Sequence, residues 1–150
     1  MIKVAQLLAR KDGCVWQVAP EDSIHRAMTL MAERGIGAVV VLQEGMLAGI
    51  VSERDCARQV IVTGRCARTT PVREIMTRQV FYTSPDEDVE HCLATMSRHH
   101  IRHLPVLAQG EDRKRVVGVI TMGDVVKAIL DQQRDRIEHL ERYISWEESF

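Results

Sequence analysis

Two stretches of the chain carry apolar residues at positions i, i+3, i+4 and i+7. They are Ile24, Ala27, Met28 and Met31 in the first stretch, and Val89, Cys92, Leu93 and Met96 in the second. This spacing places the apolar side chains on one face of an α-helix, so it predicts two amphipathic helices. Each helix is followed by two short apolar runs, at 36–42 and 47–51 and again at 101–107 and 116–120. Short apolar runs bounded by turn residues are typical of β-strands.

The same order of elements occurs twice, which indicates an internal repeat. Each copy reads strand, helix, strand, strand, helix. The first strands are predicted at 15–18 and 80–83, the closing helices at 56–61 and 125–130, and matching segments precede the copies at 4–8 and 72–76. We therefore expect a first repeat over 1–63, a linker over 64–71, a second repeat over 72–130, and a C-terminal helix and tail over 131–150.

One copy is too small to bury a sheet and two helices. We therefore expect an α/β (α+β) fold in which the two β-α-β-β-α repeats pack sheet against sheet, with the helices outside. Gly35 is placed to end the first amphipathic helix, and Ser84 with Glu87 resembles a capping box that begins the second. The C-terminal helix would pack its apolar row on its own domain or on a partner chain, with residues 145–150 frayed. That row is Leu130, Ile137, Leu140 and Ile144.

Composition narrows the class of protein. The net charge is −1 and aromatic residues make up 4% of the 150 residues, so neither a basic surface nor a base-stacking platform for nucleic acid is expected. No apolar run approaches the ~20 residues of a membrane span, and the N-terminus has no signal-peptide pattern. The four cysteines form no Cys-x-x-Cys pair, and we interpret them as free thiols in a cytoplasmic protein.

The chemistry concentrates where a strand meets a helix. Ser52 precedes Asp55 by three residues, and Thr121 precedes Asp124 in the same way, each behind a strand that contains glycine. A hydroxyl beside a helix N-terminus can bind a phosphate oxygen, and a carboxylate can accept hydrogen bonds from a ribose diol. The same pattern is also that of a plain capping box. The two interpretations are a nucleoside phosphate site and a helix cap.

The doubled pattern of 36–42 with 49–55, and of 101–107 with 118–124, resembles the CBS domain family, specifically a tandem pair (Bateman module). The resemblance covers about residues 4–130. It implies a flat unit with pseudo-twofold symmetry, two clefts between the repeats, and AMP, ADP, ATP, NAD or S-adenosylmethionine as ligand, with no cofactor required. It implies a disc-shaped homodimer as well.

The resemblance also implies roles for individual residues. Ser52 and Thr121 would contact phosphate, and Asp55 and Asp124 would contact ribose. Backbone near the adenine would come from Gly37, Ala38, Arg102 and His103, with Val18 and Thr83 nearby.

The two copies differ at the positions that face the clefts. The first motif has Arg54 where the second has Gly123, and Arg102-His103 stands where the first copy has Gly37-Ala38. Arg54, Arg102 and His103 are candidates for phosphate contact, since guanidinium groups suit phosphate oxygens. Cleft depth, the two arginines and the basic loop at 113–115 would decide which ligand group is bound beyond that phosphate. We expect the clefts to be inequivalent.

Other functions are less well supported by the sequence. His99, His100 and His103 suggest a metal site, but they straddle a helix end and a strand, which spoils the geometry. No nucleophile with a general base, P-loop or dinucleotide fingerprint is present, so an enzyme is not expected. Cys56 near a helix start is a candidate for a lowered thiol pKa or for simple packing. The remaining hypotheses are a regulatory nucleotide sensor that signals to a separate protein partner, and a structural subunit whose clefts bind nothing.

Overall fold

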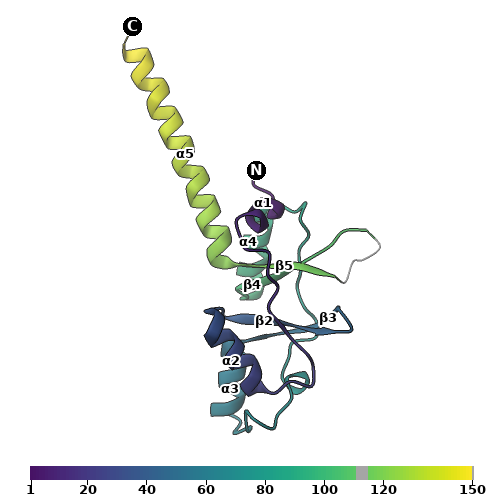
Figure 1. Cartoon of the computed structure of the whole chain (residues 1–150). Coiled ribbons are helices and arrows are strands. Elements are labelled where there is room, and N and C mark those ends of the chain that lie inside the picture. Colours follow the sequence, from purple (N-terminus) through teal and green to yellow (C-terminus); the bar gives the residue numbers. More distant parts are fainter. Residues whose placement is uncertain (111–114, 150) are drawn as a thin grey trace.

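The computed structural model describes residues 1–110 and 115–149, so most of the basic loop at 113–115 lies outside the described residues. Figure 1 shows two layers of strands, one above the other, with helices on the outer side of each layer. The elements in chain order are α1 (Val4–Ala9), β1 (Gln17–Val18), α2 (Ile24–Arg34), β2 (Ala38–Gln43), β3 (Met46–Ser52), α3 (Glu53–Ile61), the 3-10 helix η1 (Val72–Glu74), α4 (Val89–His99), β4 (His103–Leu107), β5 (Val116–Thr121) and α5 (Met122–Glu148).

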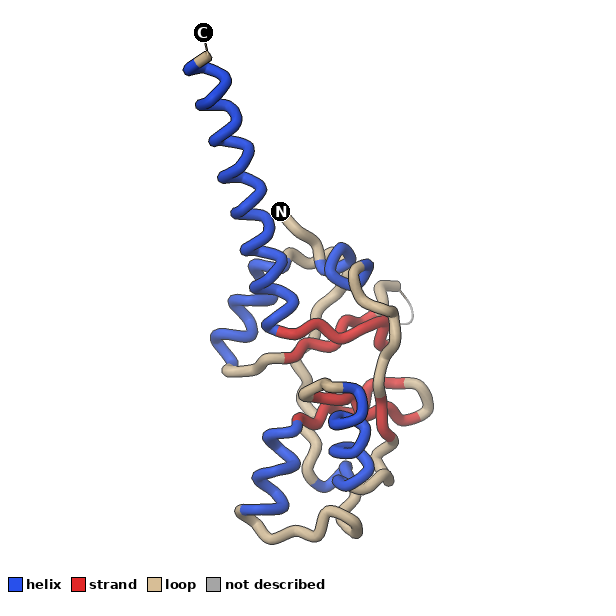
Figure 2. The backbone as a smooth tube through the Cα atoms, turned by 60° about the vertical axis from the view of Figure 1, so that its left-hand side comes forward, coloured by secondary structure: helices blue, strands red, loops and turns tan. Residues whose placement is uncertain are grey.

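The two sheets face each other, as predicted. The first has the order β1-β2-β3, with β1 parallel and β3 antiparallel to β2, and the second consists of the antiparallel pair β4-β5. Between them lies an apolar layer centred on Val40, Leu107 and Val116, which are all buried. Figure 2 shows the same arrangement from another side, with both sheets between two helical layers. Burial of this layer removes apolar surface that either sheet alone would expose to water.

The predicted end of α2 is confirmed, but the predicted start of α4 is wrong. In α2, the Ser23 hydroxyl accepts a hydrogen bond from the Arg26 N–H at 3.0 Å, and Gly35 ends the helix at φ 63°. Helix α4 begins at Val89 with Asp88 as its N-cap, four residues beyond the capping box expected at Ser84. The reason is that residues 85–88 already pair with the N-terminus, whose Val4 and Ala5 N–H groups donate to the carbonyls of residues 87 and 85 at 2.9 Å.

The strand predicted at 80–83 is reduced to a single parallel bridge between Thr83 and Val106. The Thr83 N–H donates to the Pro105 carbonyl at 3.0 Å, and the Leu107 N–H donates to the Thr83 carbonyl at 2.9 Å. The next pair in a parallel ladder would need an N–H at position 105 to donate to Phe81. Proline has no N–H, so the ladder stops there and Phe81 leaves the sheet.

The closing helix of the second repeat and the predicted C-terminal helix are one continuous helix, α5, and its last residues are helical to Glu148 rather than frayed. No proline follows position 105 in the chain, and no glycine lies between 124 and 150, so nothing interrupts the helix near Asp131. Val125 and Ala128 pack in the core, whereas the far end projects away from the body (Figure 1). Among the described residues, none of the helices combines the length and apolarity that crossing a bilayer requires.

The segment that precedes each repeat in the chain packs in the core of the other repeat. Val4 and Leu7 of α1 are buried in the core formed by α4, β4, β5 and α5. Val72 is buried in the core of the first half, with Ile75 and Met76 packed against it. We call residues 1–13 and 72–81 the exchanged segments.

The glycines in β3 and β5 admit these exchanged segments. A Cβ atom at Gly49 would lie 2.8 Å from the Thr77 carbonyl oxygen and from the Met76 Sδ. A Cβ atom at Gly118 would lie 2.5 Å from Cδ2 of Leu8. Glycine at these two positions therefore allows another segment of the same chain to approach the strand closely.

Candidate functional site

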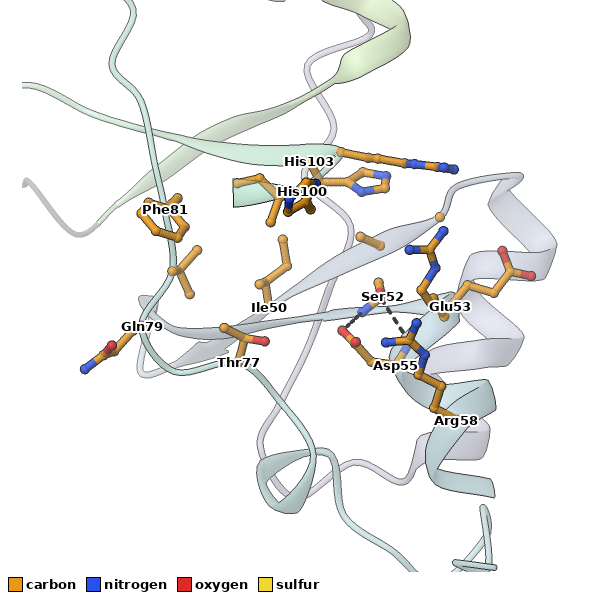
Figure 3. Close-up of a pocket in the computed structure, with 16 residues that line it drawn as sticks. Ile50, Ser52, Glu53, Asp55, Arg58, Thr77, Gln79, Phe81, His100 and His103 are labelled. Atoms are coloured by element: carbon orange, nitrogen blue, oxygen red, sulfur yellow. Dashed lines mark hydrogen bonds between the residues drawn. The ribbon is translucent and has the colours of Figure 1, made fainter. Parts of the chain in front are cut away.

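The first cleft has a volume of about 400 Å³ and lies between the start of α3, the start of β4 and the second exchanged segment. This volume falls within the range of small-molecule sites. In Figure 3, Ser52 and Asp55 lie at the start of α3 on one side, and His100 and His103 lie opposite. Phe81, released from the sheet, lines the same cleft and stacks on His99 with ring centroids 3.9 Å apart.

Ser52 and Asp55 form the capping box that was one of the two interpretations of the motif. The Asp55 N–H donates to the Ser52 hydroxyl oxygen at 3.1 Å, and the Ser52 N–H donates to Oδ2 of Asp55 at 3.2 Å. This leaves the hydroxyl proton of Ser52 and, within the described residues, Oδ1 of Asp55 without a hydrogen bond. The cap therefore holds both groups in place while keeping one donor and one acceptor available to a ligand.

Three guanidinium groups line the first cleft, from Arg54, Arg58 and Arg102. Two carboxylates, Glu53 and Asp55, line it as well, so the cleft can offer cations to a phosphate and an acceptor to a diol. Arg58 was not predicted as a site residue. It lies one helical turn after Arg54, so the helical periodicity of α3 could have indicated it.

The second cleft, of about 430 Å³, has the same framework but a different charge pattern. The Asp124 N–H donates to the Thr121 hydroxyl at 3.0 Å, and the Thr121 N–H donates to Oδ2 of Asp124 at 2.9 Å. Lys11, from the first exchanged segment, donates to the same Oδ2 at 2.7 Å. Arg34 lies 4.1 Å above the ring of Trp16, a cation–π contact in the wall of the cleft.

Lys11 also sets the charge state of Asp124. Burial alone would raise the pKa of this carboxyl group, but the hydrogen bonds from Lys11 and Thr121 outweigh burial and lower the pKa below its ordinary value. The carboxylate is therefore ionised and paired with Lys11, which lines the cleft.

His103 forms part of the wall between the two clefts and lines both of them. Its ring lies against Gly37, where an added Cβ would approach the imidazole to 3.3 Å. Burial, and then the charges of Lys11 and Arg102, lower the pKa of His103 below its ordinary value. The ring is therefore neutral at pH 7, and Gly37 is needed for its close approach.

The structure gathers seven of the eleven predicted site residues in the first cleft. They are Gly37, Ala38, Ser52, Arg54, Asp55, Arg102 and His103. Thr121 lines the second cleft, with Asp124 bonded to the Lys11 that lines it. Val18 and Thr83 line neither cleft, because both are buried in the cores, where the Thr83 hydroxyl lies 3.4 Å from the Cys92 sulfur.

Sequence reasoning missed the contributions of the exchanged segments, namely Lys11, Thr77, Gln79, Val80 and Phe81. These residues follow the matching segments 4–8 and 72–76, so the repeat indicates that they occupy comparable positions in the two halves. Among the described residues, no three His, Cys, Asp or Glu side chains come together as a metal site. Cys56 is a packed core residue, and burial raises the pKa of its thiol to about 11.

Comparison with known proteins identifies the family of this paired architecture. A family model described as CBS domain matches residues 15–61 and 72–131. The chain belongs to the CBS domain family. Its two repeats have the paired architecture that the resemblance implied, and the predicted C-terminal helix follows them, as in CBS-pair structures. The CBS domain-containing protein CBSX3, mitochondrial, from Arabidopsis thaliana is 33% identical over 138 residues, which is 89% of this chain and 65% of that relative. The chain therefore spans about two thirds of the length of this relative.

Solved CBS structures have the same fold. A protein with CBS domains from Burkholderia ambifaria superposes with a TM-score of 0.81 at 41% identity, covering 88% of this chain and 96% of that one. A CBS domain protein from Pyrobaculum aerophilum in complex with AMP has a TM-score of 0.71 at 25% identity, over 82% and 89% of the two chains. A CBS domain pair in complex with 5-methylthioadenosine and S-adenosyl-L-methionine has a TM-score of 0.76 at 26% identity, over 88% and 98%.

Proposed function

We propose that this chain is a regulatory module that binds an adenine nucleotide such as AMP, ATP or NAD in the first cleft and passes the signal to a protein partner. The observation that carries the proposal is the Ser52–Asp55 pair, which presents a donor and an acceptor beside a helix N-terminus inside a cleft lined by three arginines. The AMP and S-adenosylmethionine complexes of similar CBS pairs support this choice of ligand class.

Each group has a role that its chemistry suits. Oδ1 of Asp55 would accept a hydrogen bond from a ribose hydroxyl, and the Ser52 hydroxyl would donate to a phosphate oxygen. Arg54, Arg58 and Arg102 would neutralise the phosphate, where charge-assisted hydrogen bonds are stronger than neutral ones. Phe81 offers an apolar face to the base. No role in catalysis is assigned to any of these side chains.

Thermal unfolding with AMP, ADP, ATP, NAD and S-adenosylmethionine tests the proposal. A ligand at a hundredfold excess over its dissociation constant should stabilise the folded chain by about 2.7 kcal/mol. We expect Asp55→Ala and Ser52→Ala to abolish the shift. Ser23→Ala is the matched control, because it removes an equivalent N-cap from α2 outside both clefts and should lower stability while preserving the ligand shift.

The alternative is a structural subunit whose clefts bind nothing. It is favoured by the two capping boxes, because each makes both of its hydrogen bonds and so serves fully as a helix cap. Under this alternative, Ser52→Ala and Ser23→Ala would both cost about 1 kcal/mol, and no nucleotide would shift the midpoint of any variant. A nucleotide that stabilises the wild-type protein excludes it.

We propose further that the module is a homodimer and that the projecting part of α5 takes part in self-association. Leu130, Ile137 and Ile144 recur every seven residues, and with Leu140 they are 55–60% exposed. Seven-residue spacing places them along one face of the helix, where a second helix can cover them. Arg136 and Glu141 flank this row, at the spacing that pairs opposite charges between two parallel helices.

Light scattering after size-exclusion chromatography tests the dimer. We expect Ile137→Asp to dissociate it, because the substitution places a charge inside the apolar row. His139→Asp is the matched control, since residue 139 lies on the opposite side of the helix. A monomeric wild-type protein, or equal behaviour of the two variants, contradicts the role of α5.

A further inference from the structure

The second cleft already contains a ligand-like group from its own chain. The Lys11 ammonium donates to Oδ2 of Asp124 at 2.7 Å and to the Val119 carbonyl at 2.8 Å. Asp124 is the counterpart of Asp55, the residue that would accept the ribose hydroxyl in the first cleft. In the second cleft, the Lys11 ammonium binds Oδ2 of the equivalent carboxylate, the oxygen that also accepts the Thr121 N–H, so the carboxylate is already paired with a cation next to the oxygen that a ribose hydroxyl would need.

The repeat shows that the first cleft lacks this feature. Residues 4–8 match 72–76, so the position that corresponds to Lys11 is Gln79. Gln79 carries no charge, and in Figure 3 its side chain points away from Ser52 and Asp55. Within the described residues, Asp55 accepts one hydrogen bond, from the Ser52 N–H, and pairs with no lysine or arginine.

The contact is held in place by packing as well as by charge. Leu8, one turn before Lys11, lies against Gly118 so closely that a Cβ atom there would approach it to 2.5 Å. The lysine side chain is 36% exposed and that of Asp124 30% exposed, so the pair is only partly accessible to water. Such a pair is stronger than a fully exposed ion pair but can still be displaced.

We propose that the Lys11 ammonium competes with ribose for Asp124 in the second cleft, so that each chain binds an adenine nucleotide more tightly in the first cleft than in the second. This inference rests on the proposed function of the first cleft. A nucleotide that enters the second cleft must first displace the ammonium group from Asp124 and Val119. We expect this requirement to weaken binding there on the order of tenfold, which corresponds to about 1.4 kcal/mol.

The first experiment needs no nucleotide. Carbon-detected NMR titration of the Asp124 carboxyl group should show a lowered pKa in the wild-type protein and a higher pKa in Lys11→Gln, which copies the residue of the first cleft. Arg10→Gln is the matched control, because Arg10 pairs loosely with Asp131 at 3.9 Å, outside both clefts. An Asp124 pKa that is equal in the wild-type protein and Lys11→Gln shows that the ammonium group does not occupy the carboxylate in solution and overturns the inference.

The second experiment measures the stoichiometry of AMP by calorimetry. We expect one tight AMP site per chain and a second site about tenfold weaker for the wild-type protein and for Arg10→Gln, and two sites of similar affinity for Lys11→Gln. The double variant Lys11→Gln/Asp55→Ala should retain one tight site, which assigns the strengthened site to the second cleft. Two sites of equal affinity in the wild-type protein, or a second site that Lys11→Gln does not strengthen, overturn the inference while leaving the proposed function intact.

The failure of the proposed function itself looks different. If AMP binds neither the wild-type protein nor Lys11→Gln, both cleft assignments fall, and the inference falls with them. If AMP binds the wild-type protein and Lys11→Gln binds it more weakly at a single site, Lys11 is a ligand contact instead of a competitor, and only the inference is refuted.

Discussion

Alanine substitutions at Gly49 and Gly118 compare a steric clash with backbone to a steric clash with a side chain. Both residues lie in central positions of antiparallel strand pairs, and neither has a positive φ. The added methyl group at Gly49 meets the backbone oxygen of Thr77 at 2.8 Å, whereas at Gly118 it meets one terminal methyl of Leu8 at 2.5 Å. The approach is closer at Gly118, but the obstacle there can move.

The obstacle at Gly49 is fixed by two hydrogen bonds. The Ile50 N–H donates to the Thr77 carbonyl at 3.0 Å, and the Thr77 N–H donates to the Ile50 carbonyl at 2.9 Å. An ordinary contact of 3.4 Å would require the backbone to shift by about 0.6 Å, which strains both bonds. Overpacking of this kind costs about 1–3 kcal/mol. We expect Gly49→Ala to destabilise the chain by about 2–3 kcal/mol.

At Gly118, rotation of the Leu8 side chain relieves the clash, because the next Leu8 atoms lie at 3.6 Å. We expect a cost below about 1 kcal/mol, partly offset by the lower chain entropy of alanine in the unfolded state. Urea unfolding of both variants at equal m-values measures the difference. The reasoning predicts that a clash with backbone costs more stability than a clash with a side chain. It is refuted if Gly118→Ala destabilises the chain as much as Gly49→Ala, or if Gly49→Ala leaves stability unchanged.

Three further predictions follow from individual residues. The pKa of His103 is lowered in the folded state, so the unfolded chain binds the proton more readily and the free energy of unfolding should fall as pH drops below about 6.5. His103→Gln should reduce this dependence of stability on pH, measured by urea unfolding at pH 5–8. Burial raises the pKa of Cys56 to about 11, whereas hydrogen bonds, first from the Thr69 side chain, lower that of exposed Cys66. A thiol reagent at pH 8 should therefore label Cys66 but not Cys56, and rapid native labelling of Cys56 would contradict its burial. Pro105→Val supplies the missing N–H for Phe81, so amide 105 should be protected from hydrogen exchange, and an unprotected amide would disprove the explanation for the lost strand.

The sequence predicted the elements that depend on local patterns. The periodicity of Ile24, Ala27 and Met31 identified α2, and its Gly35 cap follows from backbone chemistry that acts over three or four residues. The strand-to-helix motif placed Ser52 and Asp55 at the start of α3, where the structure has them. Such features are set by neighbours in the chain, so one sequence suffices to find them.

Features that depend on distant contacts could not be read in this way. Nothing in the pattern of residues 4–8 indicates that α1 packs in the core of the second half, because apolar spacing records a buried face and not its partner. The same limit hid Lys11, which reaches Asp124 across 113 residues of sequence. The prediction of a cap at Ser84 was wrong for a related reason, because residues 85–88 form hydrogen bonds with the distant N-terminal segment.

The unbroken helix α5 connects the second cleft to the outside of the molecule as a lever arm. It starts directly after Thr121 and runs for 27 residues, a length of about 40 Å at 1.5 Å per residue. A tilt of about 5° at its base would move its far end by about 3.5 Å. A small rearrangement around Asp124 that leaves the fold unchanged would therefore move the far end of α5 by about the width of an atom. Another protein bound there can detect such a displacement.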